Sequence, residues 1–210
     1  MDVLNLATPA PVIPVIVIDR VESAVPLAEA LLAGGIRVLE VTLRTPVALR
    51  AIEAIARALP EAIVGAGTVR NAADVQAAGD AGCRFAVCPG YAASIAEACA
   101  LRGMAFLPGV ATATEVLRAA ADGHRFLKFF PAAAAGGVAM LKALAGPFGD
   151  VVFCPTGGID AASAPAYLAL PNVRVVGGSW LTPAEAIEAG DWPRITALAR
   201  AAAALPRRGG

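Results

Sequence analysis

The feature that most constrains the fold is an eightfold alternation of short apolar runs and alanine-rich stretches. The apolar runs, rich in Val, Ile and Phe, are Val12–Ile18, Val38–Leu43, Ala62–Thr68, Phe85–Pro89, Ala105–Val110, Phe126–Phe130, Val151–Thr156 and Val173–Ser179. The stretches with helical spacing are Val21–Ala33, Pro46–Ala58, Ala72–Ala81, Ala92–Leu101, Thr112–Ala121, Gly137–Leu144, Ala161–Leu168 and Pro193–Leu205. Near-continuous hydrophobic strands interleaved with helices predict a parallel sheet covered by helices.

Eight strand–helix units are the number found in a (β/α)8 TIM barrel. Successive strands begin about 23 residues apart, which leaves no room for a second domain or a linker. An open doubly wound sheet is the alternative, but it normally has fewer strands and needs a point where the strand order reverses. We therefore expect an α/β fold, with residues 1–210 forming one single-domain (β/α)8 TIM barrel with short loops.

Composition limits the partners and the location of the chain. It is 58% hydrophobic and 16% charged, and its formal net charge is zero. This balance argues against nucleic acid or an anionic membrane as the main partner. The longest uncharged run, Val3–Ile18, is short for a membrane span and contains Pro9, Pro11 and Pro14. With no secretion signal visible, we expect a soluble, cytoplasmic protein.

Cysteine and histidine usage gives no sign of a metal site. The four cysteines show no C-x-x-C spacing, and in a core-rich domain of this length they are expected to be free thiols. The single histidine, His124, would leave a zinc ion with an unusual set of ligands. We expect no metal site, and we interpret His124 as a loop or rim residue.

The most unusual side chain is Lys128. It lies between Leu127 and Phe129 in an apolar run, although the chain has only two lysines against fifteen arginines. Burying an ammonium group is costly, and a buried amine tends to lose its proton. A neutral amine is a nucleophile toward carbonyl carbons, so the pattern predicts a catalytic amine.

Strand alternation places other polar groups near this lysine. Because residues two apart share a face, Glu40, Thr42 and Arg44 are expected to point into the barrel. Both faces of the Lys128 strand are apolar, so alternation alone does not orient it. We favour the inward direction because only there does Lys128 meet a compensating carboxylate. The plainer interpretation is a buried Glu40–Lys128 ion pair that merely fills the barrel. Such a pair would add little stability, because the cost of removing both charges from water offsets much of their attraction.

Glycine-rich turns follow three of the predicted strands. The last two strands end in Thr156-Gly157-Gly158 and Gly177-Gly178-Ser179, where barrels often hold a phosphate on backbone N–H groups. Ser179 adds a hydroxyl donor. The third strand ends in Gly65-Ala66-Gly67-Thr68, and Thr68 is a candidate donor to a carboxylate or phosphate. Plain turns are the alternative for all three.

Taken together, these segments resemble the active-site motifs of the 2-keto-3-deoxy-6-phosphogluconate aldolase family, which also includes 4-hydroxy-2-oxoglutarate aldolases. The resemblance lies in G-I-R-V-L-E-V-T-L-R at Gly35–Arg44 and G-H-R-F-L-K-F-F-P-A-A-A-A-G at Gly123–Gly136. It extends over nearly the whole chain through P-V-I-P-V-I-V-I, E-A-I-V-G-A-G-T-V, A-G-P-F, F-C-P-T-G-G-I and G-G-S-W-L, in one order.

The resemblance implies a metal-independent class I aldolase without a cofactor, on a (β/α)8 barrel and usually a homotrimer. It implies cleavage of 2-keto-3-deoxy-6-phosphogluconate to pyruvate and D-glyceraldehyde 3-phosphate in the Entner-Doudoroff pathway, or, alternatively, a preference for 4-hydroxy-2-oxoglutarate or another 4-hydroxy-2-oxo acid. Lys128 matches the Schiff-base lysine and Glu40 the acid/base residue. The substrate-binding positions match Arg44 and Thr68 for the carboxylate, Gly157, Gly158 and Ser179 for the phosphate, and Thr156, Pro89 and Phe130 along the pocket.

Two positions depart from the family pattern. Ala132–Ala135 stands where the family usually has a polar or acidic residue, and Cys88 replaces a serine before the Pro-Gly pair. Both bear on substrate preference and neither removes a group that the chemistry needs. The competing hypotheses are a metal-dependent aldolase, a phosphate-binding isomerase or synthase, and a non-catalytic phosphosugar-binding protein.

Overall fold

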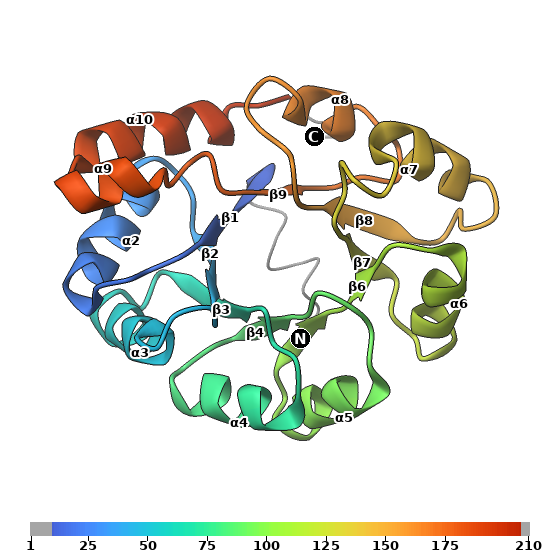
Figure 1. Cartoon of the computed structure of the whole chain (residues 1–210), viewed down its shortest axis with the longest axis horizontal. Helices are drawn as coiled ribbons and strands as arrows, with labels where there is room; N and C mark the ends of the chain where they lie inside the picture. Colours follow the sequence, from blue (N-terminus) through green and yellow to red (C-terminus); the bar gives the residue numbers. More distant parts are fainter. Residues whose placement is uncertain (1–9, 207–210) are drawn as a thin grey trace.

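The computed structural model describes residues 10–206, in which strands and helices alternate along the chain (Figure 1). The strands are β1 (Val12–Ile16), β2 (Val38–Thr42), β3 (Ile63–Gly67), β4 (Phe85–Val87), β5 (Ala105–Leu107), β6 (Gly109–Val110), β7 (Phe126–Phe129), β8 (Val152–Pro155) and β9 (Val176–Gly178). The helices are the 3-10 helix η1 (Val21–Ser23), α2 (Ala24–Ala33), α3 (Ala48–Ala58), α4 (Ala72–Asp80), α5 (Ala93–Leu101), α6 (Ala113–Ala121), α7 (Gly137–Ala145), α8 (Ala164–Leu168), α9 (Ala184–Ala189) and α10 (Trp192–Ala203).

All strand pairs within the sheets are parallel, and the strands surround a common centre with the helices outside (Figure 1). Six strands follow the order β5-β4-β3-β2-β1-β9, and a second sheet has the order β6-β7-β8. Isolated bridges, Phe153 to Val173 and Thr156 to Gly177, link the β8 side to the β9 side. The structure thus confirms an α/β fold with a curled parallel sheet.

One predicted strand is divided in two. Pro108 separates β5 from β6 within the expected run Ala105–Val110. Proline has no backbone N–H and therefore cannot donate a ladder hydrogen bond at that position. Its carbonyl oxygen still accepts a hydrogen bond from the Lys128 backbone N–H at 2.8 Å. The division therefore leaves the neighbouring strand that carries Lys128 in register.

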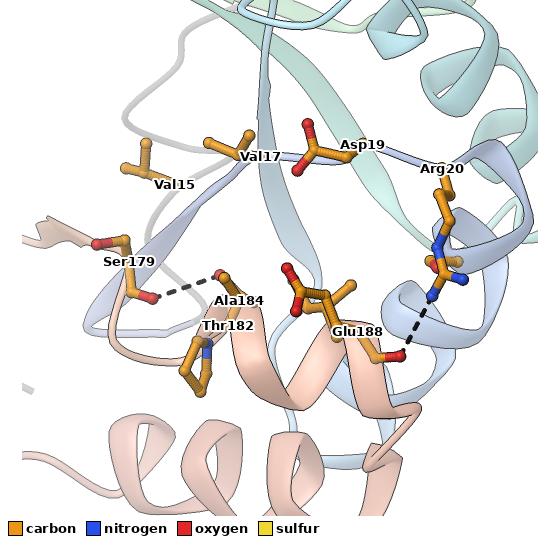
Figure 2. Close-up of a pocket in the computed structure, with 11 residues that line it drawn as sticks. Val15, Val17, Asp19, Arg20, Ser179, Thr182, Ala184 and Glu188 are labelled. Carbon is orange, nitrogen blue, oxygen red and sulfur yellow. Dashed lines mark hydrogen bonds between the residues drawn. The ribbon is translucent and has the colours of Figure 1, made fainter.

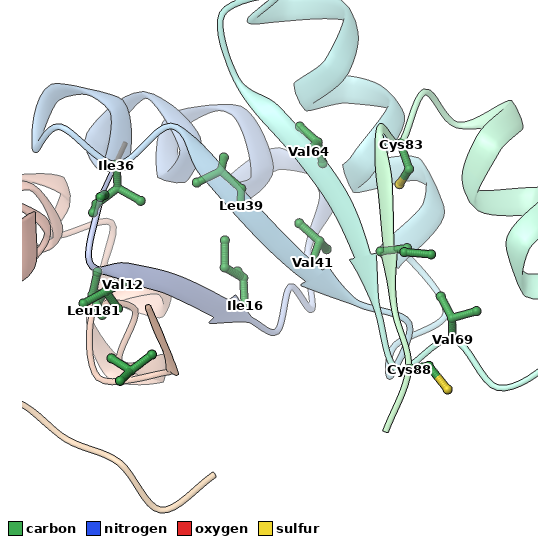
Figure 3. Close-up of a cluster of buried hydrophobic side chains, with 14 of the residues drawn as sticks. Val12, Ile16, Ile36, Leu39, Val41, Val64, Val69, Cys83, Cys88 and Leu181 are labelled. Atoms are coloured by element: carbon green, nitrogen blue, oxygen red, sulfur yellow. The ribbon is translucent and has the colours of Figure 1, made fainter. Parts of the chain in front are cut away.

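The hydrophobic core has two layers, as strand alternation requires. The outer layer lies between the strands and the helices and includes Ile16, Leu39, Val41 and Val64 (Figure 3). A smaller cluster fills the space enclosed by the strands. Its buried members are Ile13, Val38, Phe85, Val87, Ala105, Leu107, Phe126, Cys154 and Val175. Membership of one cluster or the other therefore shows which face of each strand points inward.

Most helix ends lie within two residues of the predicted ones, and two differences are larger. The short helix α9 was not expected, because six residues give too little periodicity to recognise. The stretch predicted from Ala161 becomes helical only at Ala164, because the Asp160 side chain accepts hydrogen bonds from the backbone N–H groups of Ala162 and Ser163 and holds a turn there. No helix among residues 10–206 is long and apolar enough to cross a membrane.

Candidate active site

Lys128 points into the space enclosed by the strands. On β7, Leu127 and Phe129 belong to the outer hydrophobic layer, whereas Phe126 belongs to the inner cluster. Lys128 shares the face of Phe126 because residues two apart on a strand point the same way. The orientation that the sequence left open is therefore inward.

The Lys128 ammonium group meets a carboxylate from the facing side of the ring of strands. Its Nζ donates a hydrogen bond to Glu40 Oε1 on β2 at 3.0 Å. The side chains are 5% and 3% exposed, so the pair is almost completely removed from water. Space for the carboxylate comes from Gly67 on β3, where a Cβ would lie 2.4 Å from Glu40 Oε1. At this distance one proton can pass directly between the two groups.

Apolar and weakly polar groups surround the rest of the lysine. Nζ lies 5.4 Å from the centroid of the Phe130 ring. Cys154 is the cross-strand partner of Lys128 on β8, and burial raises the pKa of its thiol to about 12. Cys154 therefore remains protonated at neutral pH and does not compete with the amine as a nucleophile. Within the described part of the chain, Glu40 is therefore the acidic group in direct contact with Lys128.

Arg44 and Thr68 form a second polar pair near the ends of β2 and β3. Arg44 Nε donates a hydrogen bond to Thr68 Oγ1 at 3.0 Å. Thr68 has a φ of 61°, in the left-handed region that non-glycine residues seldom adopt. Such strained residues cluster at ligand-binding sites, where the surrounding structure maintains them. The pair offers a guanidinium and a hydroxyl to an anion such as a carboxylate.

A cavity of about 220 Å³, here called the reaction cavity, lies above Lys128. It is lined by Val15, Val17, Arg44, Lys128, Phe130, Thr156, Gly157, Gly158, Ile159, Gly177, Gly178 and Ser179. Gly157 and Gly158 have positive φ values of 98° and 71°, a backbone shape that glycine adopts without strain. Turns of this kind can aim successive N–H groups at a phosphate.

Seven of the ten predicted site residues line this cavity, and three do not. Glu40 lies beneath it in contact with Lys128, and Thr68 is linked to it through Arg44. Pro89 is exposed and is absent from the lining, although its backbone lies against Gly109. Sequence reasoning missed the wall formed by Val15 and Val17, which the alternation along β1 with the inward-facing Ile13 could have indicated.

The two departures from the family pattern lie beside the site. Ala132 is fully buried, and its backbone N–H donates to the Thr156 carbonyl oxygen at 2.8 Å. Ala133 N–H donates to the Gly157 carbonyl oxygen at 3.0 Å. The alanine segment thus supports the glycine turn through its backbone. Cys88 is buried, its thiol donates to the Gly90 carbonyl oxygen, and burial raises its pKa.

Comparison with known proteins identifies the family of the chain. Residues 3–198 match the family model described as KDPG and KHG aldolase. The chain belongs to this aldolase family, and it is therefore a lyase. A 2-dehydro-3-deoxy-phosphogluconate aldolase of Pseudoalteromonas atlantica is 54% identical over 92% of this chain and 90% of its own length. A KHG/KDPG aldolase of Escherichia coli is 52% identical, over 94% and 93% of the two chains.

Solved structures agree with this assignment. A KDPG aldolase from Legionella pneumophila, with pyruvate captured as a covalent carbinolamine intermediate, has a TM-score of 0.95 and 48% identity over 97% of this chain and 99% of its own. The enzyme of Zymomonas mobilis ZM4 with 3-phosphoglycerate has a TM-score of 0.92, 48% identity and coverage of 98% and 97%. A 3-hexulose-6-phosphate synthase, at 19% identity and a TM-score of 0.64, shares the fold alone.

Proposed function

We propose that this aldolase cleaves 2-keto-3-deoxy-6-phosphogluconate reversibly to pyruvate and D-glyceraldehyde 3-phosphate, with Lys128 as the Schiff-base residue. The observation that carries the proposal is the buried contact of 3.0 Å between Lys128 Nζ and Glu40 Oε1 at the base of the reaction cavity. The pyruvate carbinolamine in the Legionella relative supports covalent chemistry on an amine. A pair that only filled the interior would need no cavity above it.

In the proposed mechanism Glu40 first takes a proton from Lys128. The free amine attacks C2 of the keto acid, and the hydroxyl of the resulting carbinolamine takes the proton from Glu40 and leaves as water, which gives an iminium. The C3–C4 bond then breaks, its electron pair enters the iminium to form an enamine, and Glu40, directly or through one water, accepts the C4 hydroxyl proton. The same carboxyl group returns a proton to C3, and water hydrolyses the iminium to release pyruvate and the free lysine.

The other predicted residues bind the two ends of the substrate. Arg44 and Thr68 would hold the carboxylate next to C2 and so fix the carbonyl over the amine. The backbone N–H groups of Gly157 and Gly158, with the hydroxyl of Ser179, would hold the phosphate. Thr156 and Phe130 line the passage between these ends, and Pro89 stays a prediction as a lining residue. No metal or cofactor enters any step.

We also infer that the two sheets belong to one closed eight-stranded barrel in a single domain, with β5 and β6 as one interrupted strand. The bridges between the β8 and β9 sides support this closure. The homotrimer expected from the family remains a proposal, supported by a protein cage built from symmetric oligomeric domains that covers 92% of this chain at 27% identity. Anionic sugar-acid substrates support the expected cytoplasmic location.

The two lysines of the chain allow a matched test of the catalytic role. Lys142 is exposed on α7, so Lys142→Ala should keep normal aldol cleavage. Lys128→Ala should lose at least 1000-fold in kcat, because no other amine reaches the substrate carbonyl. Equal activity of both variants would contradict the proposal. Insensitivity to EDTA would exclude the metal-dependent alternative, which inhibition by EDTA would instead favour.

Preference for 4-hydroxy-2-oxoglutarate is the second candidate function, because the Escherichia coli relative is named for both substrates. The two acids differ at the end that would lie against Ser179, where only the first carries a phosphate. Ser179→Ala should therefore lower kcat/KM for the phosphorylated substrate about tenfold and leave that for 4-hydroxy-2-oxoglutarate within twofold. Equal losses for both substrates would count against a phosphate contact at Ser179.

A further inference from the structure

The turn Cys88–Tyr91, which joins β4 to α5, has contacts that the proposed mechanism does not use. Within residues 10–206, it lines neither the reaction cavity nor the larger cavity of about 450 Å³ that adjoins it (Figure 2). Those two cavities share Val15, Val17 and Ser179. The contacts of the turn run instead to the two segments that flank Lys128.

The first contact places the turn against the strand next to Lys128. Gly109 on β6 is the cross-strand partner of Lys128. A Cβ at Gly109 would lie 2.6 Å from the Cys88 carbonyl oxygen and would be closer still to the backbone of Pro89. The Cys88 thiol donates to the Gly90 carbonyl oxygen, which closes the turn on itself. The backbone of the turn is therefore packed onto β6 as closely as a glycine permits.

The second contact ties the turn to the segment that leads into β7. The Tyr91 hydroxyl donates a hydrogen bond to the Asp122 carboxylate, and the Tyr91 ring meets the His124 ring edge-on, with centroids 5.7 Å apart. His124 in turn meets Phe106 on β5, with centroids 5.5 Å apart. Asp122 and His124 lie between α6 and β7. Tyr91 therefore holds the chain just before the strand that carries Lys128.

The protonation states of the two rings suit this contact at neutral pH. Partial burial, together with the hydrogen bond to Asp122, raises the pKa of Tyr91 to about 12, so the phenol keeps the proton that it donates. Partial burial also lowers the pKa of His124, so its ring is uncharged and packs as an aromatic ring. The hydrogen bond and the ring contact are thus present together under the conditions in which the aldolase would work.

We propose that Tyr91 is a positioning residue for Lys128. The turn that Tyr91 anchors holds β7 from two directions, through Gly109 beside Lys128 and through His124 before it. The inference rests on the proposed function, because the group that is positioned is the Schiff-base amine. Packing alone is the plainer role of the Tyr91 ring, and it would leave the reactivity of Lys128 unchanged in every folded molecule.

The positioning role predicts a separation between catalysis and binding. The turn contacts β6 and the segment before β7, whereas the residues proposed to bind the substrate follow β2, β3, β8 and β9. They are Arg44, Thr68, Gly157, Gly158 and Ser179. Loosening the turn should therefore slow imine formation on Lys128 and leave the affinity for substrate nearly unchanged.

Three substitutions test this role. Tyr91→Ala removes the ring and the hydroxyl, Tyr91→Phe keeps the ring contact with His124, and Gly109→Ala displaces the turn from β6. Leu101→Ala, at a position 87% exposed at the end of α5, is the matched control. The measurements are kcat and KM for cleavage of 2-keto-3-deoxy-6-phosphogluconate, and the time course of the pyruvate adduct trapped by borohydride on Lys128. The final amount of adduct counts the folded sites, and its rate of formation reports how well the amine is placed.

The expected result is a loss in rate without a loss in binding. Tyr91→Ala should lower kcat and the trapping rate about tenfold while KM stays within about twofold, because a misplacement of about 1 Å can cost up to about 100-fold in rate. Gly109→Ala should show the same pattern. Tyr91→Phe should keep about a third or more of the wild-type kcat, and Leu101→Ala should stay within about twofold of wild type in both constants.

Two kinds of failure can be told apart. A raised KM with unchanged kcat in Tyr91→Ala, or a smaller amount of adduct formed at the wild-type rate, would overturn the positioning role, since the turn would then bind substrate or only stabilise the fold. Wild-type rates in both Tyr91→Ala and Gly109→Ala would overturn it as well. Absence of any adduct on Lys128 in the wild-type enzyme would instead overturn the proposed function.

Discussion

Removing the lysine should make the protein markedly less stable, because Glu40 would then keep a buried charge without a partner. In Lys128→Met the side chain keeps nearly its length but loses the ammonium group that lies 3.0 Å from Glu40 Oε1. The Glu40 side chain is only 3% exposed, so water cannot replace the lost partner. Breaking a buried ion pair in this way costs about 3 to 5 kcal/mol. For a chain of this size that loss lowers Tm by roughly 6 to 20 °C.

A second substitution separates charge burial from loss of packing. Glu40→Met combined with Lys128→Met replaces both charged groups by apolar groups of similar volume. Such replacements are often neutral or stabilising, so the double variant should return to within about 1 kcal/mol of wild type. Lys142→Met, at an exposed position on α7, should stay within about 0.5 kcal/mol of wild type.

Urea unfolding followed by circular dichroism measures these differences, provided that the m-value is the same for all variants. If Lys128→Met were as stable as wild type, the reasoning would be refuted, because Glu40 would then not be held as a buried charge. A double variant that is no more stable than Lys128→Met would refute it as well, since the loss would then come from packing.

Three further predictions follow from the structure. Gly67→Ala should lower kcat at least tenfold, because the new Cβ would lie 2.4 Å from Glu40 Oε1, whereas Gly90→Ala, with open space at its Cβ, should retain activity. Burial raises the pKa of Cys83 from 9.0 to about 12, so the folded chain keeps a proton that the unfolded chain loses, and stability falls as pH rises above 9. Cys83→Ala should remove about 1.4 kcal/mol per pH unit from the slope of unfolding free energy between pH 9 and 11, and an unchanged slope would contradict this pKa. Thr112→Ala breaks the capping box of α6 and should lower the free energy of unfolding by about 1 kcal/mol, measured by thermal unfolding. A variant as stable as wild type would show that the cap is dispensable.

The parallel strands and most helices could be predicted from the sequence because each carries its own local signal. Alternation along β2 was enough to place Glu40 on the inner face, since Val41 and Leu43 fill the other face. Alternation along β7 was not enough, because both faces of that strand are apolar. The orientation of Lys128 depends on which residues of neighbouring strands form the inner cluster, and that is a property of the assembled sheet.

The features that sequence reasoning missed are short or depend on distant segments. Helix α9 has six residues, and Pro108 interrupts a strand whose composition is otherwise continuous. Alternation along β1 could have indicated that Val15 and Val17 face inward, but not that the Thr42 and Thr45 hydroxyls hold the end of β1 against the next strand. That contact joins segments far apart in the chain, and no local pattern records it.

The central claim is that Lys128 forms a covalent imine with pyruvate. Incubation of the enzyme with pyruvate and borohydride, followed by digestion and mass spectrometry, tests it directly because reduction makes the bond permanent. We predict one reduced pyruvate adduct, located on the peptide that contains Lys128 and absent from the peptide that contains Lys142. An unmodified Lys128 in enzyme that is active before reduction, or an adduct on Lys142 instead, would contradict the account.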